Sequence, residues 1–134
     1  MNMPKGPLTN ILVGINVLIF LVVWLGGFQQ QAVVEGALIP ARLTGALGSA
    51  GAYDFWWPAW VTLLTHAFLH IDFSHLLFNM LILFFCGRFV ELALGWKLMG
   101  LVYLTGAIAG GLAETAWSPG SLNPVLGASG AIAA

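Results

Sequence analysis

Three histidines, an asparagine and a serine are the residues of this chain whose types and spacing could carry chemistry. His66, His70 and His75 lie in the stretch THAFLHIDFSHLLFN, which ends at Asn79. Ser129 lies in the sequence GASG near the C-terminus. Both stretches are apolar enough to lie in a membrane, where a polar side chain must find a hydrogen-bond partner or a water-filled cavity. Both are therefore candidate parts of a functional site.

His75 and Asn79 are four residues apart, so on a helix their side chains share one face, about 40° apart around the axis and roughly 6 Å apart along it. Two roles fit this spacing. The pair could donate hydrogen bonds to one reacting oxygen, as His and Asn side chains do in an oxyanion hole. It could also hydrogen-bond to a neighbouring helix, as polar residues of membrane spans often do. The spacing alone leaves both roles open.

Ser129 is predicted at the start of a helix, where backbone amides lack acceptors and favour an anion. A hydroxyl there could act as a nucleophile, or it could simply cap the helix. A nucleophile elbow of the α/β-hydrolase type is excluded. That motif requires glycine two residues after the serine, where this chain has Ala131, and a preceding strand, where it has the loop SPGSLNPVL.

A metal site is the main alternative for the three histidines, because imidazoles are common zinc ligands. However, the zinc-protease helix HExxH requires glutamate after its first histidine, and Ala67 follows His66 here. Asp72 is the only acidic residue close by in the sequence, and it lies in a predicted turn. We therefore predict no metal and no other cofactor.

The composition indicates a membrane protein, because 60% hydrophobic and 7% charged residues cannot cover a soluble surface. The net charge of -1 gives no indication of nucleic-acid binding. The single cysteine, Cys86, cannot form an internal disulfide and is predicted to be a small core residue.

A membrane-crossing helix needs about 20 mostly apolar residues, and three stretches qualify. They are predicted at about residues 9–27, 74–89 and 96–113, and a fourth begins near Ser129. No small-x-small cleavage site directly follows the first, which favours a mature helix over a signal peptide. Residues 28–73 are predicted to lie at the membrane interface, since they combine the helix-breaking piece TGALGSAGA with several tryptophans. The predicted fold is an all-α polytopic helical bundle with three complete spans and the start of a fourth.

Basic residues in short loops predict the orientation. Lys5 precedes the first span, and Arg88 and Lys97 lie between the second and third, so all three fall on one side, which should be cytoplasmic. Gly106 and Gly110 have the small-xxx-small spacing of closely packed helices. That spacing serves packing inside the bundle or self-association, so a homo-oligomer stays open.

In their order along the chain, these motifs resemble the rhomboid family of intramembrane serine proteases. The resemblance covers about residues 60–134: the THAFLH run, HLLFN, GRFVELALG with Gly87, Glu91 and Gly95, the glycine-rich third span, and GASG. It implies that Ser129 is the nucleophile. It implies further that His75, Asn79 and the backbone amide of Ser129 form the oxyanion hole, while His66 and His70 are structural and the first loop lies half submerged in the outer leaflet.

Two departures from the family pattern stand out. The arginine that members often carry after a tryptophan is absent at Trp60-Val61-Thr62, so the sequence does not predict what anchors the first loop. The family's general base is a histidine on the sixth span, and the resemblance implies that it would follow residue 134. A serine hydroxyl is a weak nucleophile without such a base.

The resemblance implies an intramembrane protease that cleaves membrane-spanning proteins in the lipid bilayer without a cofactor. Residues 1–134 are expected to be the N-terminal part of one such domain, inactive by itself, in a multi-pass protein of the plasma membrane with a cytoplasmic N-terminus. The alternative is a non-catalytic relative that binds or remodels membrane proteins.

Overall fold

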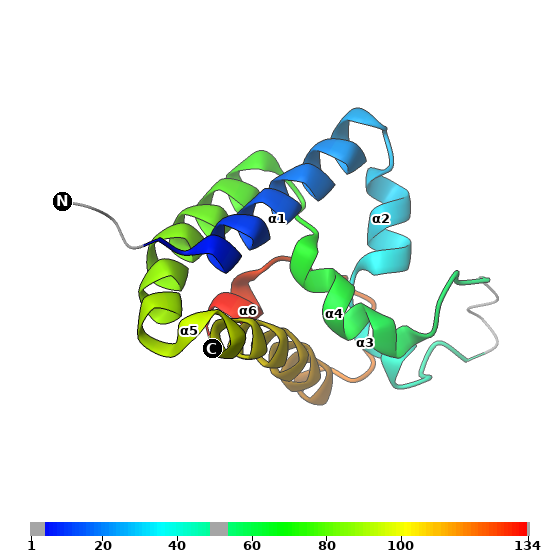
Figure 1. The fold of residues 1–134 in the computed structure, drawn as a ribbon. Helices are drawn as coiled ribbons and strands as arrows, with labels where there is room; N and C mark the ends of the chain where they lie inside the picture. The colour runs from blue at the N-terminus through cyan, green and yellow to red at the C-terminus, as the bar shows by residue number, and fades with distance from the viewer. Residues whose placement is uncertain (1–4, 49–53, 134) are drawn as a thin grey trace.

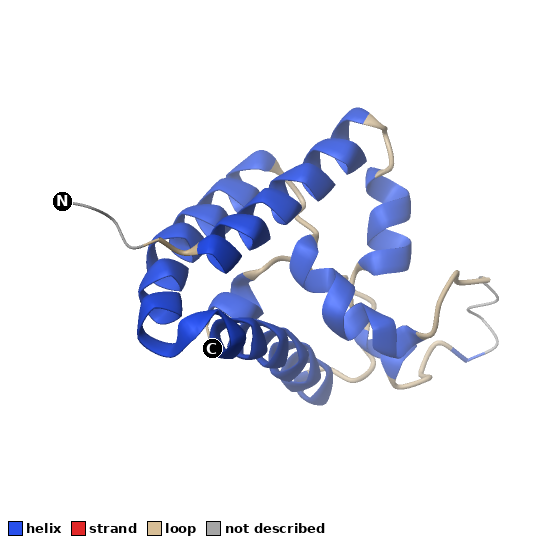
Figure 2. Cartoon of the chain, viewed as in Figure 1, coloured by secondary structure: helices blue, strands red, loops and turns tan. Residues whose placement is uncertain are grey.

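The computed structural model describes residues 5–48 and 54–133 of the chain. In these ranges the chain is helical, without strands, and one isolated antiparallel bridge joins Leu38 to Val125 (Figure 2). The elements in chain order are α1 (Pro7–Leu25), α2 (Gln29–Gly36), α3 (Pro40–Leu43), η2 (Ala59–Val61), α4 (Thr62–Thr65), η3 (His66–Phe68), α5 (Phe73–Trp117) and α6 (Ser129–Ile132) (Figure 1). The predicted helical class is therefore confirmed.

Two of these helices, α1 and α5, are long and apolar enough to cross a membrane. Proline begins α1, where its missing N–H and fixed φ suit the first turn of a helix. The segments predicted as second and third spans belong to the single element α5. Its backbone breaks only at Gly95, with φ 79° and ψ 161°, a conformation open to glycine. Figure 1 shows the chain changing direction there: the first half of α5 runs beside α1, and the second half runs away from the turn past α6.

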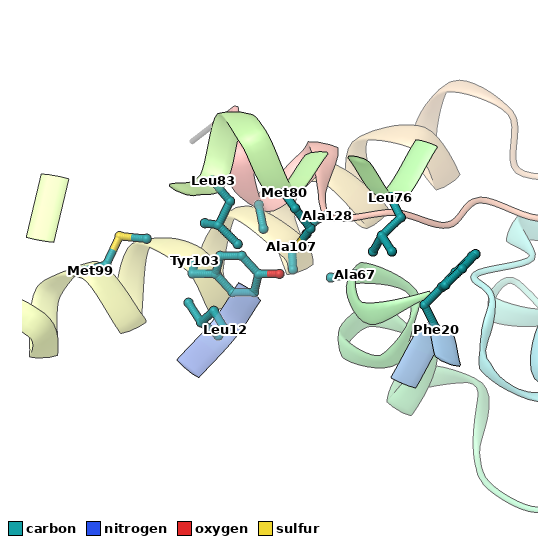
Figure 3. Close-up of a cluster of buried hydrophobic side chains, with 11 residues drawn as sticks. Leu12, Phe20, Ala67, Leu76, Met80, Leu83, Met99, Tyr103, Ala107 and Ala128 are labelled. Carbon is teal, nitrogen blue, oxygen red and sulfur yellow. The ribbon is translucent and has the colours of Figure 1, made fainter. Parts of the chain in front are cut away.

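The hydrophobic core lies where α1 and the two halves of α5 meet (Figure 3). Tyr103 is at its centre, 1% exposed, and its hydroxyl accepts a hydrogen bond of 3.4 Å from the Asn16 amide. The labelled side chains around it come from α1, η3, α5 and the residue before α6: Leu12, Phe20, Ala67, Leu76, Met80, Leu83, Met99, Ala107 and Ala128. A core shared in this way fixes the position of His75 on α5 relative to Ser129 on α6.

The beginning of α1 is tied to the middle of α5 by one carboxylate. Glu91 is buried and accepts hydrogen bonds from the backbone N–H of Leu8 at 2.9 Å and from the N–H and hydroxyl of Thr9, each at 2.8 Å. These amides lie in the first turn of α1, where they have no intrahelical acceptor and attract negative charge. Gly87, one turn before Glu91, lets Thr9 approach, since a Cβ there would lie 3.0 Å from the Thr9 methyl. Gly87 therefore provides the space for Thr9, and Glu91 provides the hydrogen-bond acceptor.

The connection predicted at residues 28–73 folds into short helices that are held by Arg42. This side chain is buried, and its guanidinium donates to the backbone oxygens of Val34, Glu35 and Trp57. Burial lowers the pKa of Arg42, an effect that the charge of Glu35 partly offsets. Arg42 thus supplies the anchor of the first loop that the sequence after Trp60 did not predict.

The glycine-rich piece predicted to break this region lies partly outside the described residues. Gly45 and Gly48 have positive φ and turn the chain as expected, whereas residues 49–52 are not described. Trp56 and Trp60 are largely exposed.

Candidate active site

The first two turns of α5 position His75 and Asn79. Asp72 caps this helix, accepting hydrogen bonds from the Ser74 hydroxyl at 2.6 Å and the His75 N–H at 2.8 Å. These two bonds favour the charged carboxylate and lower the pKa of Asp72. One turn later, the Asn79 amide donates to the backbone oxygen of His75 at 2.9 Å. The predicted shared face of His75 and Asn79 is therefore present on a capped, regular helix.

Gly127 brings the loop before α6 against this face. A Cβ at Gly127 would lie 2.6 Å from both Cε1 and Nε2 of His75 and 3.7 Å from Nδ2 of Asn79. The φ of Gly127 is +116°, which side chains rarely adopt. Its N–H donates to the backbone oxygen of His66 at 2.9 Å. Gly127 thus lies against the His75 ring with the Asn79 amide close by, two residues before Ser129.

Ser129 is the first residue of α6, and it is exposed. The N-cap of α6 is Ala128, and no side chain caps the helix. The alternative interpretation of Ser129 as an N-cap is therefore wrong.

The glycines of α5 hold α6 in place. A Cβ at Gly110 would lie 3.2 Å from Cα of Gly130, and one at Gly130 would lie 3.8 Å from the backbone oxygen of Gly106. The small-xxx-small face is thus used for packing inside the chain. This close approach sets the residue after Ser129 directly against the second half of α5.

His66 and His70 have different partners. The Nε2 atom of His66 is 3.2 Å from the backbone oxygen of Ala107, which links η3 to α5, and burial lowers the pKa of His66. The ring of His70 lies 5.1 Å from the ring of His75, between centroids. Burial first and the neighbouring His75 second lower the pKa of His70 to about 4. His70 is therefore neutral at pH 7 and places no charge beside His75.

No pattern in the sequence predicted the contacts that hold the loop before Ser129. Leu38 and Val125 exchange two backbone hydrogen bonds of 2.9 and 2.7 Å. Nearby, the Ala41 N–H donates to the Ser121 oxygen at 3.0 Å. A bridge of one residue pair leaves no hydrophobic periodicity, so only the structure shows that the first loop supports the approach to Ser129.

Helices long and apolar enough to cross a membrane, with polar residues gathered at the end of one of them, define an integral membrane protein with a candidate catalytic site. The sequence pattern of the Rhomboid domain matches residues 58–134, more than half of the chain, so the chain belongs to the rhomboid family. It is 44% identical over 73 residues to "Rhomboid protease GluP" of Bacillus subtilis (strain 168). The match covers 54% of this chain and 14% of that protein's length.

Proposed function

We propose that this chain is part of an intramembrane serine protease that cleaves membrane-spanning proteins. The observation that carries the proposal is the close approach of Gly127 to the His75 imidazole, with the Asn79 amide nearby, two residues before Ser129. Membership of the rhomboid family and likeness to a protein named a rhomboid protease support it.

In this mechanism the Ser129 hydroxyl attacks the peptide carbonyl, and three N–H groups receive the oxyanion: those of the His75 ring, the Asn79 amide and the Ser129 backbone. Asn79 has two amide N–H groups, and its one recorded bond to the His75 oxygen leaves the second for the oxyanion. His75 donates through Nε2, which with Cε1 is the part of the ring that lies against Gly127, only in the tautomer that leaves Nδ1 unprotonated. No partner of Nδ1 is recorded in the described part of the chain.

The general base is proposed to be a histidine beyond residue 134, because each histidine of this chain has another use. His66 is bonded to the Ala107 oxygen, His75 is an oxyanion donor, and His70 is buried against His75. The tetrahedral intermediate collapses as the base gives its proton to the leaving amine, and water then releases the acyl group from Ser129.

Three spans are part of this proposal: α1 and the two halves of α5 on either side of Gly95. Each half has about 22 residues, or roughly 33 Å of helix, enough for the hydrocarbon layer. Residues 1–134 would then form the N-terminal part of one plasma-membrane domain with a cytoplasmic N-terminus. The Arg88 side chain supports this orientation, since it donates to Asn10 at 2.7 Å and so lies beside the start of α1 with Lys5.

The test is labelling by a fluorophosphonate, which reacts with activated serines. The 134-residue chain in detergent should not be labelled, because no base activates Ser129. Addition of the further family spans with their histidine should give both labelling and cleavage of a model transmembrane substrate, and Ser129→Ala should abolish both. Strong Ser129-dependent labelling of the 134-residue chain would show a base already present. A folded extended protein without labelling would instead indicate a non-catalytic relative.

A further inference from the structure

Asp72 holds an exposed carboxylate on the backbone of His75, the candidate oxyanion donor. Its Oδ1 atom accepts the bonds from the Ser74 hydroxyl at 2.6 Å and the His75 N–H at 2.8 Å. Both bonds end on Oδ1, so the exposed carboxylate can accept a further donor through Oδ2. The bond from Ser74, the bond from His75 and, to a smaller extent, charge on the His75 ring lower the pKa of Asp72. The group is therefore ionised at pH 7.

None of the basic residues of this chain is an exposed neighbour of Asp72. The chain has four, all in its described part: Lys5, Arg42, Arg88 and Lys97. Arg88 follows Asp72 by 16 residues on α5, roughly 24 Å along the helix, which exceeds the Debye length of about 10 Å at 0.1 M salt. Lys5 lies beside Arg88, and Lys97 follows the break in α5. Arg42 is buried on three backbone oxygens. The charge of Asp72 is therefore open to a cation from another molecule.

The residues on either side of Asp72 are apolar and exposed. Ile71 is 65% exposed and Phe73 is 66% exposed. A lysine or arginine side chain combines an apolar stem with a cationic end, and so matches a carboxylate flanked by apolar surface. Such a side chain reaches Asp72 from a peptide whose scissile carbonyl lies at His75, because each residue of an extended peptide advances only about 3.3–3.6 Å.

We propose that Asp72 determines substrate specificity, selecting a lysine or arginine within about three residues of the scissile bond. The carboxylate binds the cationic end of that side chain, and Ile71 and Phe73 contact its stem. An acidic side chain at the same position of the substrate is repelled. This inference rests on the proposed protease function and adds to it the charge of the preferred substrate.

A set of transmembrane substrates tests the proposal on the extended protein that carries the further spans. Its members differ only at one position close to the cleavage site, which is lysine, glutamine or glutamate, and each nearby position on both sides is tried in turn. At one or more positions kcat/KM should fall in the order lysine, glutamine, glutamate, by about tenfold over the two steps, as for an exposed ion pair replaced by a like-charge pair. The ratio should approach one at about 0.5 M salt, which screens exposed charges. Equal kcat/KM at every position, or a preference for glutamate, would overturn the proposal.

Asp72→Asn removes the charge and keeps the helix cap, since asparagine caps helices as well as aspartate does. The melting temperature should stay close to that of the unaltered protein, and the lysine-to-glutamate ratio of kcat/KM should fall to about one. Glu114→Gln, at an exposed glutamate near the end of α5, is the matched control and should keep the ratio. A ratio that survives Asp72→Asn would overturn the role of Asp72. Failure to cleave any substrate, together with failure of fluorophosphonate labelling, would instead contradict the proposed protease function and with it this inference.

Discussion

Gly127 is the residue at which the candidate site tolerates the least change. Two independent constraints act on it: a φ of +116°, and a ring atom of His75 only 2.6 Å from where a Cβ would be. Either constraint alone favours glycine. Together they mean that a change at Gly127 alters both the backbone of the loop before α6 and the position of the His75 imidazole on α5.

Gly127→Ala should therefore displace the His75 ring and strain the loop. In the extended protein that carries the further spans, the rate of fluorophosphonate labelling should fall by roughly 10²-fold, as for one misplaced oxyanion donor. Gly120→Ala is the matched control, since nothing lies within 4 Å of a Cβ there. Equal labelling rates in the two variants would mean that Gly127 does not shape the site.

Asn79→Ala, in the same extended protein, should slow turnover of a transmembrane substrate by roughly 10²-fold to 10³-fold. The melting temperature should change little, because the recorded bond of the Asn79 side chain is to its own helix, at His75. His66→Ala should show the opposite pattern, with a lowered melting temperature, since it removes the link to Ala107. Asn123→Ala, at an exposed loop residue, is the control for both. Unchanged turnover in folded Asn79→Ala would rule out the oxyanion role.

Residue types and spacing marked Ser129, His75 and Asn79 as candidates, because polar groups in apolar sequence stand out, whereas the roles proposed for them come from the resemblance to the rhomboid family. Arg42 and Glu35 did not stand out in the same way. They lie in a long loop of mixed character, where a charged residue is normally solvated, and only the fold shows that both are buried.

Among the elements, α5 shows how far the length of apolar stretches in the sequence predicts helices. Length and composition placed apolar helices at 74–89 and 96–113, and the structure has one element broken at Gly95, between these ranges. The short helices α2, α3 and α4 were not predicted. Helices of this length are unstable alone and depend on tertiary contacts, so they leave no reliable local signal in the sequence.

The contact between α1 and α5 leads to a stability prediction. Glu91→Ala should lower the free energy of unfolding by about 3 kcal/mol, because it leaves the Leu8 and Thr9 donors buried without their charged acceptor. Thr9 is fully buried, so water cannot easily replace the carboxylate. Unfolding in a denaturing detergent titration measures the difference, with Glu114→Ala as the exposed control. A loss no larger than that of the control would mean that this cap does not stabilise the bundle.

At the scale of the whole molecule, the testable property is orientation in the membrane. In a Cys86→Ser background, Gly120→Cys should react with a membrane-impermeant thiol reagent added outside intact cells. Leu94→Cys, beside the break at Gly95, should react only after the membrane is opened. This follows from the proposed orientation, which places Lys5, Arg88 and Lys97 on the cytoplasmic side. The reverse pattern would invert the proposed topology.

The bond between Glu91 and the start of α1 also has a consequence for biosynthesis. Leu8 and Glu91 are 83 residues apart. At about 5–20 residues per second, roughly 4 to 17 s pass on the ribosome between synthesis of the first amides of α1 and synthesis of the carboxylate that accepts from them. During this interval only water or lipid headgroups can satisfy those amides. We therefore expect the start of α1 to be hydrated while this helix enters the bilayer, and to exchange that water for protein only when the first half of α5 lies beside it.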